Sequence, residues 1–120
     1  MTEAQAAVSW AGRHAIVALP AEIDISNSDE VYGLLLSVIG QDPETVTVDL
    51  SGTRFCDSAG VRAIVQASRQ ARSHGTELRL AVGQSPVTRV LTLTGLDQIL
   101  PLYRDVQHSR DTPRASTHGS

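Results

Sequence analysis

The stretch VDLSGTRFCDSAGVRAI, residues 48–64, joins the end of a strand pattern to the start of a helix pattern. Upstream, Val46, Val48 and Leu50 alternate with polar residues, which is typical of a β-strand. Downstream, apolar residues recur at helical spacing from about Ser58 to Ser73, and the His-Gly pair at residues 74 and 75 predicts the end of the helix. A strand, a polar turn and a helix in this order are the repeating unit of an α/β protein.

The segment before this stretch predicts a hairpin and a first helix. In AVSWAGRHAIVAL, residues 7–19, two β-prone runs flank a turn near Gly12, and the second run is apolar enough to be covered on both faces. Apolar residues at 31, 34, 35, 38 and 39 then form one stripe of a helix. Asn27 with Glu30 predicts a capped start for this helix, and Gly40 predicts its end.

The segment after it predicts a further strand at residues 78–82, a third helix and a short last strand. Ser85 is expected to cap the third helix, which Gly95 ends, and Pro101 in QILPLY indicates an edge strand. The order β-β-α-β-α-β-α-β predicts an α/β fold with a mixed β-sheet, built from the N-terminal hairpin plus parallel strands joined by helices.

The length of 120 residues is that of a single domain, which we expect to span residues 1–106. Residues 107–120, QHSRDTPRASTHGS, contain no apolar residue larger than alanine. Such a segment buries too little surface to offset its loss of conformational entropy, so it is predicted to be a disordered polar tail.

Composition excludes several kinds of partner. The net charge of −3, with ten basic residues that are scattered along the chain, disfavours nucleic acid. No apolar run reaches the roughly 20 residues of a membrane helix, and MTEAQAAVSW does not resemble a secretory signal. We therefore expect a cytoplasmic protein with no membrane partner, in agreement with its single cysteine.

Ser58 is the candidate functional residue, and the sequence leaves two interpretations of it open. A serine at a helix start is a common cap, which is the more frequent role at such a position. Its neighbours Ala59 and Gly60 are small enough to leave the hydroxyl uncovered. A phosphate there, with Asp57 adjacent and Asp24 expected at the same sheet edge, would make the surface strongly negative and repel a partner of the uncharged form.

Catalysis finds no support in the sequence. No histidine has a context that brings it to Ser58 as a base, no phosphate-binding loop motif is present, and no metal-ligand spacing occurs. Cys56, flanked by an acidic residue and without a second cysteine, is interpreted as a small buried hydrophobic residue. We expect no enzyme activity, no metal and no cofactor.

VDLSGTRFCDSAGVRAI, together with EIDISN and LTLTGLDQIL, resembles the anti-sigma factor antagonists of the STAS domain family over about residues 8–106. The resemblance implies a STAS-like fold in which Ser58 is the phosphoacceptor. It further implies that the dephosphorylated form binds an anti-sigma factor that is also a GHKL-type serine kinase, which supplies the ATP, and that a PP2C-type phosphatase reverses the modification. The partner-binding surface is expected to comprise Asp24, Ile25, Asn27, Phe55, Asp57, Ala59, Gly60 and Arg62.

Two departures from the family pattern, Ala21 in place of a glycine and Cys56 in place of an aliphatic residue, remove no needed chemical group. Some family members, including transporter-associated and lipid-trafficking ones, lack the phosphorylation cycle. The alternative function is therefore a non-phosphorylated STAS adaptor that binds a small molecule or regulates a transport complex. Neighbouring genes for a kinase and a sigma factor, or for transport proteins, would discriminate between the two.

Overall fold

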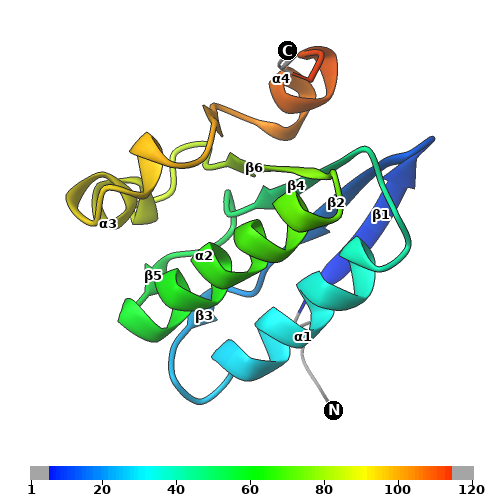
Figure 1. The fold of residues 1–120 in the computed structure, drawn as a ribbon. Helices are drawn as coiled ribbons and strands as arrows, with labels where there is room; N and C mark the ends of the chain where they lie inside the picture. Colours follow the sequence, from blue (N-terminus) through cyan, green and yellow to red (C-terminus); the bar gives the residue numbers. More distant parts are fainter. Residues whose placement is uncertain (1–5, 115–120) are drawn as a thin grey trace.

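A computed structural model describes residues 6–114 of the chain, and its main feature is a mixed five-stranded sheet (Figure 1). The strands lie in the order β1-β2-β4-β6-β7. They comprise β1 (Ala7–Ala11), β2 (His14–Ala18), β4 (Thr45–Asp49), β6 (Glu77–Ala81) and β7 (Leu102–Tyr103). β1 and β2 are antiparallel, and the other neighbours pair in parallel. The predicted α/β fold with an N-terminal hairpin and parallel strands is confirmed.

The hairpin turns where the sequence predicts it. Ala11 pairs with His14, so the loop has two residues, and its first residue, Gly12, has a positive φ of 62°. A positive φ at this position suits a two-residue hairpin turn with glycine first.

Helices α1 (Ser28–Ile39) and α2 (Ser58–Ser73) lie next to each other across one face of the sheet (Figure 1). α3 (Val87–Leu93) and a short 3-10 helix, η1 (Leu96–Gln98), follow β6. α2 has the predicted bounds, and Gly95 adopts the expected positive φ of 79° after α3. Pro101 precedes β7, which is an edge strand as predicted.

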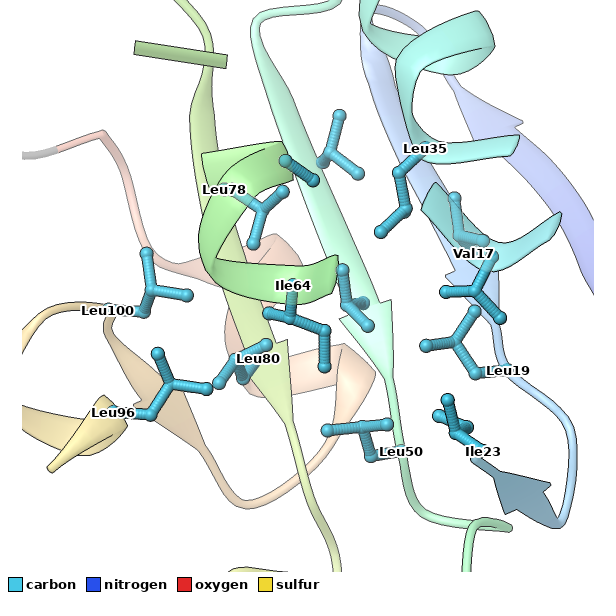
Figure 2. Close-up of a cluster of buried hydrophobic side chains, with 14 of the residues drawn as sticks. Val17, Leu19, Ile23, Leu35, Leu50, Ile64, Leu78, Leu80, Leu96 and Leu100 are labelled. Carbon is cyan, nitrogen blue, oxygen red and sulfur yellow. The ribbon is translucent and has the colours of Figure 1, made fainter. Parts of the chain in front are cut away.

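One hydrophobic core lies between this sheet face and the helices (Figure 2). Val17 and Leu80 point from the strands toward Leu35 of α1 and Ile64 of α2. Leu96 of η1 belongs to the same cluster. The apolar stripes that predict the helices therefore pack against the alternating residues that predict the strands.

The C-terminal segment differs from the expectation of disorder. Residues 106–111 form helix α4 (Val106–Asp111), which contacts β4 and β6 on the second face of the sheet. The Oγ1 atom of Thr47 hydrogen-bonds the Oγ atom of Ser109 at 2.7 Å, and both side chains are buried. This polar helix is ordered by contacts with strands that lie far away in the sequence. Residues 115–120 lie outside the described range.

Arg79 on β6 is only 1% exposed and holds the C-terminal segment against the sheet. Its guanidinium donates to the carbonyl oxygens of Ser109 and, at 2.7 Å, of Thr112, and it pairs with Glu77 at 2.9 Å. A buried guanidinium needs such partners, because an unsatisfied charge in the interior is very costly. β4 and β6 are thus covered on both faces, and nearly all of their residues are buried.

The helix ends differ in detail from the predicted caps. Asn27 occupies the N-cap position of α1 without making a side-chain cap hydrogen bond. α1 ends before Gly40 as predicted, but the residue with a positive φ in this turn is Asp42. The Ser85 hydroxyl accepts a hydrogen bond from the backbone N–H of Val87 at 3.0 Å, in agreement with its predicted capping role.

Candidate functional site

Two short strands that the sequence pattern did not predict bring the polar loops together. β3 (Glu22–Ile23) and β5 (Phe55–Cys56) form a separate two-stranded parallel sheet, in which Ile23 pairs with Cys56. The backbone N–H of Asp57 continues this ladder by donating to the carbonyl oxygen of Ile23 at 3.1 Å. The loops after β3 and β5 therefore lie side by side, as expected from a shared sheet edge (Figure 1).

Asp57, and not Ser58, caps α2. The carboxylate of Asp57 accepts hydrogen bonds from the backbone N–H groups of Ala59 at 2.9 Å and Gly60 at 3.1 Å. Ser58 is the first helical residue, which corrects the interpretation of Ser58 as a cap. An aspartate at this position also places a negative charge at the positive end of the helix dipole.

The side chain of Ser58 is exposed, and its hydroxyl makes no hydrogen bond to any residue between 6 and 114. Asp57 already satisfies the helix N–H groups that a serine at this place would otherwise bond. The hydroxyl of Ser58 therefore has no structural task in the described part of the chain and faces solvent.

Gly60 has a packing role that the sequence did not indicate. Gly60 is buried, and an added Cβ would lie 2.6 Å from Cys56 Sγ and 2.8 Å from Ile23 Cγ2. The absent side chain lets α2 pack closely against β3 and β5. This corrects the expectation that Gly60 belongs to the partner-binding surface, because a buried residue is out of reach of a docking protein.

The loop after β3 is held by its own side chains. Asp24 Oδ1 accepts hydrogen bonds from the backbone N–H of Ser26 at 2.9 Å and from its hydroxyl at 2.5 Å. The hydroxyl of Ser26, followed by its backbone N–H, lowers the pKa of Asp24 below its usual value. Asp24 is therefore a stably ionised carboxylate.

Asn27 ties this loop to β3 instead of capping α1. Its Oδ1 atom accepts a hydrogen bond from the backbone N–H of Asp24 at 2.9 Å, and its Nδ2 atom donates to the carbonyl oxygen of Glu22 at 2.8 Å. These two bonds fix the direction in which residues 24–26 project from the domain.

An open groove of about 250 Å³ lies between α1 and α2 beside this loop. It brings together Ile25, Ala59 and Arg62 of the predicted partner-binding residues. Ile25 is 80% exposed, and Phe55 on β5 is 52% exposed, which is unusual for large apolar side chains. Five further residues line the groove: Ser28, Asp29, Tyr32, Ala63 and Gln66.

The sequence did not indicate those five residues as part of a site, although helical spacing carries a partial signal. Ser28 and Tyr32 are four residues apart on α1, and Ala63 and Gln66 continue the face of α2 that begins at Ala59. Periodicity can assign residues to one helix face, but only the packing of α1 beside α2 shows that the two faces border one groove.

Cys56 is 3% exposed, which confirms its interpretation as a buried apolar residue. Burial, assisted by the charge of Asp57, raises the pKa of the Cys56 thiol to about 11. A thiol that stays protonated is a poor nucleophile. Among residues 6–114, no group of histidine, cysteine or carboxylate side chains has the arrangement of a metal site, and no helix could span a bilayer.

A mixed sheet with an N-terminal hairpin, two helices across one face and a serine presented at the start of the second helix define a small α/β domain. The chain belongs to the STAS domain family, whose model matches residues 5–109. STAS proteins that are anti-sigma factor antagonists are not enzymes, and the sequence contains no catalytic motif.

One curated relative places the chain among the anti-sigma factor antagonists, and two solved structures of such proteins share its fold. It is 30% identical over 89 residues to the anti-sigma F factor antagonist of Paenibacillus polymyxa, an alignment that covers 73% of this chain and 76% of that protein. An anti-sigma factor antagonist from Mycobacterium paratuberculosis has the same fold, with a TM-score of 0.76 and 22% identity over 88% of this chain and 90% of that one. The unphosphorylated anti-sigma factor antagonist SpoIIAA gives a TM-score of 0.74 at 18% identity, covering 88% and 93%.

Proposed function

We propose that this chain is an anti-sigma factor antagonist that works as a partner switch. In its unphosphorylated form it binds an anti-sigma factor that is also a GHKL-type serine kinase, and the sigma factor is released. The γ-phosphoryl group of ATP is transferred to the Ser58 hydroxyl, which loses its proton, and ADP is left. The complex with the anti-sigma factor then dissociates. A PP2C-type phosphatase hydrolyses the phosphoserine and restores the binding form.

The observation that carries this proposal is the position of the Ser58 hydroxyl. It is exposed at the first position of α2, while the carboxylate of Asp57 holds the helix N–H groups. A kinase can therefore reach the hydroxyl without disturbing the cap.

Electrostatics explain why the modification would act as a switch. A phosphoserine carries a charge of about −1.5 to −2 at neutral pH. Asp57 occupies the N–H groups of Ala59 and Gly60, so these two helix amides are not free to bind the phosphate. It would add to the negative charges of Asp24 and Asp57, opposed in this region by Arg62.

The unphosphorylated surface offers a partner both apolar and polar contacts. Ile25 and Phe55 supply apolar area that loses water on docking, and the groove beside Ile25 is lined by Arg62 and Asp29. A partner that covers this surface buries the position of Ser58 at or near its rim. Introducing a dianion at such a place costs desolvation as well as charge repulsion.

The test is phosphorylation of the full chain by its cognate anti-sigma factor with ATP and magnesium, followed by peptide mass mapping. We expect one phosphate, located on Ser58, which a PP2C-type phosphatase removes. Ser58→Ala is expected to accept no phosphate, whereas Ser73→Ala, which removes an exposed hydroxyl at the far end of α2, is expected to be phosphorylated normally. Phosphate on another residue, or none on the unmodified chain, contradicts the proposal.

A further inference from the structure

β1 is an edge strand without the usual protection. Among residues 6–114, no strand pairs with its outer edge, which lies at the border of the sheet (Figure 1). Soluble proteins commonly protect such edges with charged residues, proline or bulges. β1 reads AVSWA and pairs with β2 in an unbroken register, so it has none of these features.

The hairpin turn fixes which backbone groups face outward. Ala11 and His14 flank the two-residue turn and bond each other through their main chains. Main-chain hydrogen bonding alternates from residue to residue along an antiparallel pair, so the N–H and C=O groups of Ser9 also point toward β2. The N–H and C=O groups of Val8 and Trp10 therefore point away from the sheet, toward any strand that approaches the edge.

We propose that β1 pairs in antiparallel fashion with β1 of a second copy of this chain, around a two-fold axis at Ser9, which joins the two sheets into one. The sequence of the strand is complementary to itself in this register. Val8 of one copy lies opposite Trp10 of the other, and the two Ser9 residues face each other. Four main-chain hydrogen bonds form from the outward groups of Val8 and Trp10.

The side chains favour a second copy as the occupant of this edge. Val8 and Trp10 are 38% and 41% exposed and lie on the same face of the strand. A cross-strand pair of an aromatic and a β-branched residue is stabilising, and the two-fold axis makes this pair twice. Because β1 carries no charge, no like charges meet across the axis.

This inference is independent of the proposed function, since β1 and the β3–β5 loops belong to different sheets. The contact area of a five-residue strand is small, so the dimer is expected to dissociate on dilution. Sedimentation velocity of the full chain should show the average mass rising toward twice that of the monomer with concentration. A mass that stays monomeric at all concentrations overturns the inference.

A cysteine at position 9 tests the register. Facing residues at a non-hydrogen-bonded position have Cα atoms about 4.5 Å apart, which a disulfide can span. Ser9→Cys should therefore give a covalent dimer rapidly under mild oxidation, whereas the control Ser73→Cys, exposed at the end of α2, should not. The native Cys56 is buried and does not interfere. Equal rates for the two variants overturn the inference.

A charge at the same position provides a second test. Ser9 is exposed in the monomer, so Ser9→Asp should keep the circular dichroism spectrum and thermal unfolding of the unmodified chain. Two aspartates would face each other across the axis, and we expect the concentration-dependent mass increase to be lost. A dimer that persists in Ser9→Asp uses another surface and contradicts the proposed pairing.

Discussion

The carboxylate of Asp57 accepts a hydrogen bond from the backbone N–H of Gly60 at 3.1 Å and thereby caps the helix on which Ser58 is the first residue. Capping and presentation of the hydroxyl are thus divided between adjacent residues. Ser58 is free for chemistry because its neighbour stabilises the helix start.

The first prediction separates these two roles by stability. Asp57→Ala should lower the free energy of unfolding by about 0.5–2 kcal/mol, the usual cost of a lost cap. Ser58→Ala should change it by no more than about 0.5 kcal/mol, because the hydroxyl makes no bond to the described residues. Urea unfolding of both variants measures the difference, and a Ser58→Ala loss as large as that of Asp57→Ala would refute this division.

The second prediction concerns charge at Ser58. Ser58→Glu should bind the cognate anti-sigma factor about tenfold more weakly or worse, whereas Ser58→Ala should bind like the unmodified chain. Added salt should narrow the gap, because it screens exposed charges. Titration calorimetry measures the affinities. Ser73→Glu, at the far end of α2, is the matched control and should bind normally; equal affinities for all variants contradict the charge mechanism.

The third prediction concerns the contact between α2 and the β3–β5 pair. Gly60→Ala should lower the free energy of unfolding by about 1–3 kcal/mol, because the new methyl group collides with Cys56 and Ile23. Gly33→Ala on α1 meets open space and should instead raise it by roughly 0.5–1 kcal/mol through helix propensity. Denaturant titration of both variants compares them. A stabilising Gly60→Ala would show that α2 is not packed as closely as described.

The fourth prediction concerns Arg79 and the C-terminal helix. Arg79→Met keeps much of the apolar stem but removes the donors to Ser109 and Thr112, so it should cost about 1.5–3 kcal/mol. Backbone amides of α4 should then exchange hydrogen faster than in the unmodified chain. Arg72→Met, on the exposed surface of α2, should leave the exchange of α4 unchanged. Unaltered exchange in Arg79→Met would mean that other contacts hold α4.

The fifth prediction is an alkaline loss of stability from Cys56. Folding raises the pKa of the thiol from 9.0 to about 11, so the folded state prefers the protonated form. This contribution is complete below pH 9 and is lost as the pH rises through about 11. The unmodified chain should therefore lose stability relative to Cys56→Ala over this interval, as measured by urea unfolding at several pH values. A constant difference between the two would contradict the pKa shift.

The helices and long strands could be predicted because their signals are local. The period of the apolar residues indicates where α2 begins, and the residues after Ser73 indicate where it ends. The hairpin turn depends only on the local backbone conformation at Gly12. β3 and β5 have two residues each, too few to show a period. α4 could not be predicted because its order depends on Arg79 and Thr47, which are distant in the sequence.

The sequence by itself determined the order of elements, the α/β class and the place of Ser58 at the start of a helix, since periodicity and turn residues act over a few neighbours. Only the tertiary structure decided that Gly60 faces inward and that β3 pairs with β5. These features depend on which segments pack together, and packing joins residues whose separation along the chain carries no local signal.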